Sequence, residues 1–110
     1  MKIPLSRIAH GRSGDKGDMS NIGIIAYDER HYPVLLREVT PERVKTHFGA
    51  LIEGRVERYE MPNLGALNFL CYGALGGGGT FSLRIDAQGK TLAAGLLGME
   101  IEVDERELTN

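Results

Sequence analysis

The chain has 110 residues, of which 42% are hydrophobic and 25% charged, with a formal net charge of -2. Chains of this size and composition usually fold as one soluble domain around one core, so we expect a single domain over residues 1–110. Thirteen lysines and arginines against fifteen acids leave no basic excess, which argues against nucleic acid as a partner.

The N-terminal sequence and the single cysteine indicate a cytoplasmic protein. Residues 1–7 lack the long apolar stretch of a signal peptide, and no segment has the length of a membrane span, so we expect no membrane association. Cys71 lies in an apolar run and has no second cysteine with which to pair. It is therefore expected to be a small buried residue in a reducing compartment, outside any disulfide or zinc site.

The first quarter of the chain predicts two strands with a glycine-rich loop between them. Residues 2–9 alternate imperfectly, as in a strand with a bulge. Residues 22–27 have apolar side chains at both odd and even positions, which is typical of a strand covered on both faces. Residues 10–18, between these strands, are rich in glycine and charge and predict a loop.

Two helices are expected next. Apolar residues over 32–39 fall at helical spacing, and the pattern stops before Thr40 and Pro41. A second helix begins there, because Thr40 can cap its N-terminus and proline suits the first helical position. Four apolar residues between 44 and 52 form its buried stripe, and Gly54 is expected to end it.

The second half of the chain predicts mainly strands. We expect strands over 55–61, 66–75 and 80–86, although the apolar run 66–75 also fits a helix by length. A hairpin turn at 87–90 then leads into a strand over 91–103. The small residues in that last strand, Ala93, Ala94, Gly95 and Gly98, predict the close approach of a partner's backbone.

These elements together define an α+β domain. They predict a largely antiparallel sheet with helices packed on one face. Because the helical sequence can cover one face only, the other face is expected to be solvated or covered by a partner.

The glycine-rich segment 10–18 is the main candidate site. Its glycines, at positions 11, 14 and 17, allow backbone N–H groups to converge on an anion, and Arg12 and Lys16 supply positive charge. This pattern favours a binding loop for a phosphate or carboxylate. A solvated loop, in which the charges of Asp15 and Asp18 pair with those two cations, explains the same residues.

Catalytic chemistry is less well supported by the residues. His10 beside Asp15 or Asp18 could serve as an acid–base group, although a lone histidine is more often structural. Ser13 lies between His10 and Asp15, but no strand–turn–helix elbow presents it as a nucleophile. The three histidines are scattered along the sequence, so we expect no metal.

Two other segments allow both a functional and a structural interpretation. The run 76–79 consists of four glycines and could cover a ligand or form a hairpin connection. Asn63 and Asn68 could fix a substrate carbonyl, but asparagine is equally common in turns.

The motif at 9–18, continued by Asn21-Ile22-Gly23, resembles the small ferredoxin-fold domain of the acyclic terpene utilisation (AtuA-like) family. Further stretches carry the same resemblance, at 56–59, 62–63, 67–69, 74–78, 82–86 and 89–90. The resemblance implies a ferredoxin-like fold and a role in the catabolism of acyclic terpenes or related branched acids, carried as coenzyme A thioesters. In that family the domain commonly ends a much larger protein and also occurs as a separate small chain, which is the form expected here.

The resemblance favours function at the glycine-rich segment without supplying a reaction. We therefore predict an anionic-substrate site formed by Arg12, Ser13, Gly14, Asp15, Lys16, Gly17, Asp18, Asn21, Asn68, Gly77 and Gly78. No cofactor is implied, whereas a coenzyme A thioester is a candidate substrate.

Two hypotheses follow. The chain is either an accessory subunit that helps a large AtuA-like chain to bind substrate, or a structural module that stabilises or oligomerises that partner. A homo-oligomer and a stand-alone enzyme remain open, the latter disfavoured by the sparse acid–base residues.

Overall fold

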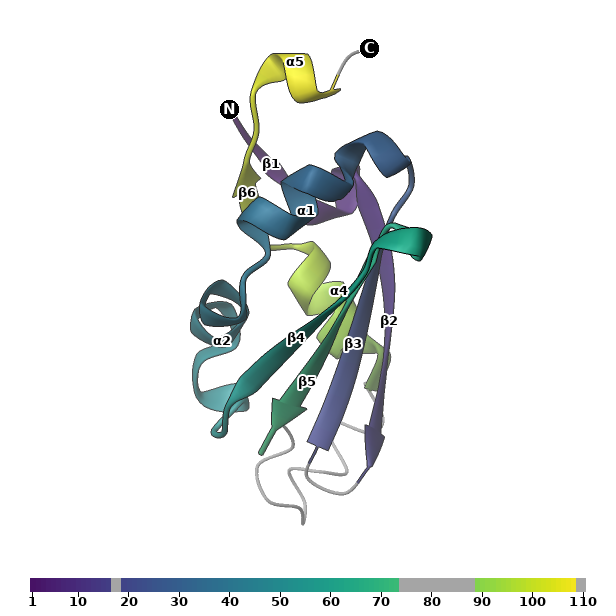
Figure 1. Cartoon of the computed structure of the whole chain (residues 1–110). Coiled ribbons are helices and arrows are strands. Elements are labelled where there is room, and N and C mark those ends of the chain that lie inside the picture. The colour runs from purple at the N-terminus through teal and green to yellow at the C-terminus, as the bar shows by residue number, and fades with distance from the viewer. Residues whose placement is uncertain (17–18, 74–88, 109–110) are drawn as a thin grey trace.

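A four-stranded antiparallel sheet forms the body of the protein (Figure 1). The computed structural model describes residues 1–16, 19–73 and 89–108. The sheet has the strand order β2-β3-β5-β4, and its strands are β2 (Ala9–Lys16), β3 (Met19–Ala26), β4 (Val56–Met61) and β5 (Ala66–Tyr72). Each neighbouring pair is antiparallel.

One face of this sheet packs against helices. These are α1 (Tyr32–Glu38), α2 (Pro41–Phe48) and α4 (Gly89–Leu97). Ile22, Ile24, Leu67 and Phe69 point from the sheet into the same core as Leu35, Val44 and Leu96 from the helices, and all seven are fully buried. The expected α+β architecture, an antiparallel sheet with helices on one face, is confirmed.

A small second sheet joins the two ends of the described chain. Strand β1 (Lys2–Pro4) pairs with β6 (Glu100–Glu102), and Ile3 opposite Ile101 is buried. The short helix α5 (Glu105–Leu108) follows, close to the N-terminus (Figure 1). Four 3-10 turns complete the described elements: η1 (Leu5–Arg7), η2 (Glu29–His31), η3 (Gly49–Leu51) and η4 (Pro62–Leu64).

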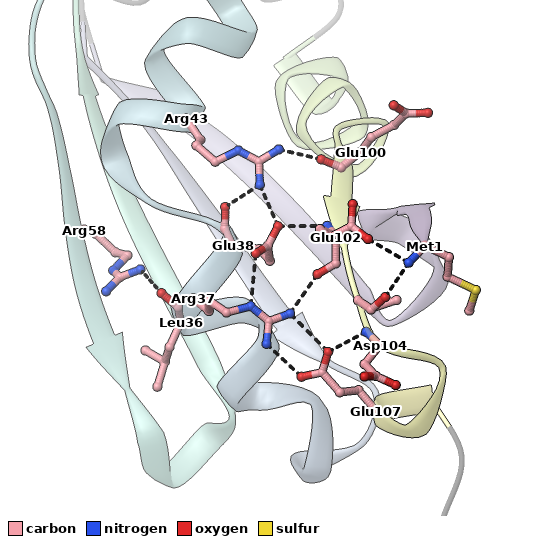
Figure 2. Close-up of polar contacts among 11 residues, drawn as sticks. Met1, Leu36, Arg37, Glu38, Arg43, Arg58, Glu100, Glu102, Asp104 and Glu107 are labelled. Atoms are coloured by element: carbon pink, nitrogen blue, oxygen red, sulfur yellow. Dashed lines mark hydrogen bonds and ion pairs between the residues drawn. The ribbon is translucent and has the colours of Figure 1, made fainter.

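A network of charged side chains holds this C-terminal segment against α1 and α2 (Figure 2). The Arg37 guanidinium donates to both carboxylate oxygens of Glu107, at 2.8 and 3.1 Å, and to the Glu102 carbonyl at 2.7 Å. Glu38 accepts from the Glu102 backbone N–H at 2.8 Å, and Arg43 donates to the Glu100 carbonyl at 2.7 Å. The backbone of the segment is therefore held by side chains of α1 and α2 at both Glu100 and Glu102.

The predicted helices and the strands β4 and β5 are confirmed. The Thr40 hydroxyl accepts from the Arg43 backbone N–H at 3.2 Å, as expected for an N-cap. The run 66–75 forms a strand as far as Tyr72. The second helix, however, ends at Phe48, because Gly49 adopts a φ of 57° and starts the turn η3. The prediction that this helix ends at Gly54 is therefore wrong.

The prediction of a loop over 10–18 is wrong for its first seven residues, which belong to β2. The predicted strand 2–9 is instead split into β1, η1 and the first residue of β2. Gly11 explains the error, because a Cβ at this position would come within 2.7 Å of the Gly23 carbonyl oxygen. Glycine at position 11 allows close packing inside the sheet. Because glycines lack side chains, the alternation of apolar and polar residues that indicates a strand is not visible in this segment.

The predicted strand over 91–103 is also wrong for its first part, which forms α4. Gly89 and Lys90 begin this helix and do not close a hairpin. A Cβ at Gly95 would lie 3.3 Å from the Phe48 ring, and Ala93 lies against Gly11, so these small residues let α4 approach α2 and β2 of the same chain. The alternation of buried Met99, Ile101 and Val103 with exposed glutamates is confirmed. The predicted strand over 80–86 and the glycines 76–79 lie outside the described residues.

Candidate functional site

The site lies on the face of the sheet opposite the helices, which we call the open face. Because paired residues of neighbouring strands share a face, the register defines rows that run across the sheet. One row consists of Arg12 on β2, Gly23 on β3, Asn68 on β5 and Tyr59 on β4. This row therefore places a guanidinium and an amide on either side of a residue with no side chain.

Gly23 forms the floor of a hollow in this face. A Cβ built at Gly23 would meet only the Arg12 carbonyl oxygen and Asn68 Oδ1, each at 3.9 Å, which is ordinary contact. Packing within the protein therefore does not require glycine here. The surrounding cavity has a volume of about 480 Å³, which lies within the range of small-molecule sites, roughly 300–1,000 Å³.

The polar part of the cavity is formed by Arg12, Asn21 and Asn68. Asn21 Nδ2 lies 3.5 Å from Asn68 Oδ1, at the limit of a hydrogen bond. Arg12 is exposed and, within the described ranges 1–16, 19–73 and 89–108, forms no ion pair. A guanidinium beside two amides suits an anion, because it can donate a bidentate pair of hydrogen bonds while an amide donates a third.

The apolar part of the cavity lies one row further along the strands. Ile25 pairs with Ala66, and Ala66 pairs with Met61, so these three side chains cross the sheet side by side. Leu64 of η4 completes this wall and is 65% exposed. The cavity therefore has a polar end and an apolar end.

A second polar cluster occupies the far edge of the open face. The Glu57 carboxylate accepts from Arg55 Nε at 2.8 Å and from the hydroxyls of Tyr59 and Tyr72 at 3.0 and 3.2 Å. Arg55 also lies 4.1 Å above the Tyr72 ring. The hydrogen bond from Arg55 lowers the pKa of Glu57, and the hydrogen bond that Tyr59 donates to Glu57 raises the pKa of Tyr59. The Glu57 carboxylate therefore stays ionised, and its negative charge is paired with Arg55.

The structure brings together five of the residues that the sequence nominated. Arg12, Ser13, Gly14, Asn21 and Asn68 all line the cavity. The Ser13 hydroxyl, however, accepts from the Ala93 backbone N–H at 3.3 Å and so faces α4. The side chains of Arg12 and Ser13 therefore lie on opposite faces of β2.

His10 lies on the open face, outside the cavity. Its ring stacks on Tyr27 with 5.0 Å between the centroids. The backbones of Asp15 and Lys16 belong to the last part of β2. Gly17, Asp18, Gly77 and Gly78 lie outside the described residues.

The sequence did not nominate Gly23, Ile25, Met61, Leu64 or Ala66. A signal was present for two of them, because Gly23 and Ile25 share their parity with Asn21 on one strand. The other three come from a segment about forty residues further along the chain.

The described residues contain no group of three or more His, Cys, Asp or Glu side chains that could hold a metal ion. Cys71 is fully buried in the core, as expected, and burial raises its thiol pKa to about 11. Within the described part of the chain, no helix is sufficiently long and apolar to cross a membrane.

The family model of the AtuA ferredoxin-like domain matches residues 3–102. The protein therefore belongs to this family of ferredoxin-like domains, as its sequence motifs indicated. Neither the curated proteins nor the solved structures compared with the chain include a match.

Proposed function

We propose that this protein is the cytoplasmic accessory subunit of an AtuA-type system for branched acyl compounds, and that its open-face cavity binds the anionic group of the substrate. Membership of the family supports the general role. The observation that carries the binding proposal is the placement of Arg12, without an ion pair among the described residues, beside the hollow at Gly23.

Charge supports an anionic ligand. The Glu57 carboxylate, at the far edge of the same face, is held by Arg55 and two tyrosine hydroxyls. It therefore offers Arg12 no competing partner within the described residues. A bound carboxylate would supply the hydrogen-bond acceptors that the guanidinium needs.

The arrangement favours binding over chemistry in this chain. Ser13 faces α4, and His10 stacks on Tyr27 outside the cavity. The Ser13 hydroxyl is thus engaged on the helix side of β2, and His10 is not among the residues that line the cavity. We therefore assign the chemical step to a large AtuA-like partner chain.

A second function is favoured by a different observation. Tyr27, Tyr59 and Leu64 on or beside the open face are 66%, 49% and 65% exposed. Tyrosine and arginine are enriched where interfaces gain most of their binding energy. The same face could therefore dock a large partner in a purely structural role.

Thermal unfolding with added anions tests the binding proposal. Inorganic phosphate and 3-methylbutanoate should raise the Tm of the wild-type chain, and Arg12→Ala should remove this effect. Arg7→Ala is the matched control, because Arg7 is exposed in η1 and does not line the cavity. Equal protection of all three proteins would overturn the proposal.

A further inference from the structure

The spacing of polar and apolar rows on the open face restricts the kind of ligand that the cavity can hold. The polar row contains Arg12, Gly23 and Asn68. The adjacent row on this face begins with His10, which does not line the cavity, and continues with the apolar residues Ile25, Ala66 and Met61, which do. The two rows are two residues apart along each strand, which corresponds to roughly 7 Å. A ligand that uses both must carry its apolar part directly beside its charge.

We infer that the cavity takes a compact free monocarboxylic acid, with its carboxylate at Arg12 and its hydrocarbon body over Gly23 toward Ile25, Met61 and Leu64. This inference rests on the proposed anion-binding function and names the substrate class for the same cavity. It also makes Gly23 the specificity-determining position, because the depth of the hollow depends on its missing side chain.

A coenzyme A thioester fits this spacing poorly. Its acyl group carries no charge at the thioester carbonyl, and the whole pantetheine arm separates it from the nearest phosphate. The hydrocarbon and an anion of such a ligand cannot occupy rows that lie roughly 7 Å apart. Arg12 is also the only cationic side chain among the described lining residues, whereas coenzyme A carries several phosphate charges.

The floor of the cavity supports a ligand body that lies flat on the sheet. Gly14, Gly23 and Ala66 are small residues on three adjacent strands, with Asn21, Asn68 and Ile25 beside them. A Cβ at Gly14 would lie 3.3 Å from Asn21 Oδ1, so the amide borders the hollow directly. Larger side chains at these floor positions would raise the floor into the volume assigned to the hydrocarbon.

Calorimetric titration of the full chain distinguishes the ligand classes. The probes are 3-methylbutanoate, its methyl ester and its coenzyme A thioester, with acetate as an anion without a bulky body. The free branched acid should bind most tightly, and the uncharged ester should bind at least about tenfold more weakly, because it loses the charge-assisted hydrogen bonds. A thioester that binds as tightly as the free acid would overturn the inference.

Two variants separate this inference from the proposed function. Arg12→Ala should weaken the binding of every carboxylate probe by about tenfold or more. Gly23→Val should weaken the binding of 3-methylbutanoate about tenfold and change the affinity for acetate by no more than about twofold, because it fills the hollow without removing the cation. If Arg12→Ala has no effect on any anion, the proposed function fails; if only the Gly23→Val discrimination is absent, the substrate class alone is wrong.

Folding of Gly23→Val is checked by its far-UV circular dichroism and Tm. Gly23→Ala provides the conservative second variant, because its added Cβ makes only contacts of 3.9 Å. It should also weaken the binding of 3-methylbutanoate more than the binding of acetate, but by a smaller factor than Gly23→Val does. If both variants fold and bind 3-methylbutanoate and acetate with the same ratio of affinities as the wild type, Gly23 does not determine specificity.

Discussion

Arg12 and Asn68 lie on either side of Gly23, in one row across β2, β3 and β5. The guanidinium and the amide belong to segments more than fifty residues apart, and the glycine between them leaves room for a ligand. Two faces of one sheet thus have different tasks: the helix-covered face supplies the core, and the open face supplies the candidate site.

The two glycines of the paired strands β2 and β3 should respond differently to alanine. Gly11→Ala should destabilise the protein by about 1–3 kcal/mol, because its Cβ would lie 2.7 Å from the Gly23 carbonyl oxygen and 2.9 Å from Ile24 Cδ1. Gly23→Ala should be neutral or slightly stabilising. Urea unfolding of both variants measures the difference, and similar losses in both would contradict the assigned packing.

Ser13→Ala should separate stability from binding. Its hydroxyl accepts a hydrogen bond from the Ala93 backbone N–H on the helix side of β2, so its removal should lower the free energy of unfolding by about 1 kcal/mol. Binding of 3-methylbutanoate should remain, since Arg12 lies on the other face. A variant that keeps its stability and loses binding would instead show that the Ser13 hydroxyl contacts the ligand.

The C-terminal network should make stability fall in acid. Hydrogen bonds from Arg37 lower the Glu107 pKa from its ordinary value of 4.5 to about 2. A lowered pKa means that the ion pair stabilises the fold above pH 4.5 and that this contribution is lost as the pH falls toward 2. The pair is partly exposed, so the effect should not exceed about 1 kcal/mol.

Comparison of wild type with Glu107→Gln isolates that contribution. Urea unfolding between pH 7 and pH 2.5 should show a difference at neutral pH that shrinks in acid. Arg106→Ala serves as the control, because its side chain is 90% exposed and contacts Asp104 only at 3.4 Å. A difference that persists unchanged at pH 2.5 would contradict the assigned pKa.

The accessory and structural roles predict different effects on a complex. If the chain binds substrate for a large partner, Arg12→Ala should abolish turnover while native mass spectrometry still detects the assembly. If the role is purely structural, activity should follow assembly, and Tyr59→Ala should reduce both. The partner is first sought as a heteromeric mass in gently captured material from the source cells.

Cys71 should resist thiol reagents in the folded protein. It is fully buried, and its pKa of about 11 keeps it protonated at neutral pH. Labelling with an aromatic disulfide reagent at pH 7.5 should therefore be slow and should become fast in urea. Rapid labelling of the native protein would show that the core opens around β5.

The sequence by itself determined the elements whose patterns are local. Thr40 and Pro41 marked the start of a helix, and the alternation of Met99, Ile101 and Val103 identified buried positions, because capping and side-chain periodicity depend on neighbouring residues. The sequence motif at 9–18 also indicated the family whose model matches the chain.

Only the tertiary structure decided that this glycine-rich segment is a strand and that α4 is a helix. In both segments, small residues stand where larger side chains would show the periodicity of a strand or helix. The small residues allow close contact with elements distant in the chain, such as Gly11 with Gly23 and Gly95 with Phe48. The cavity likewise depends on register, since pairing of β3 with β5 places Asn68 beside Gly23. A shift of one residue would turn these side chains to the other face, and no local pattern specifies that alignment.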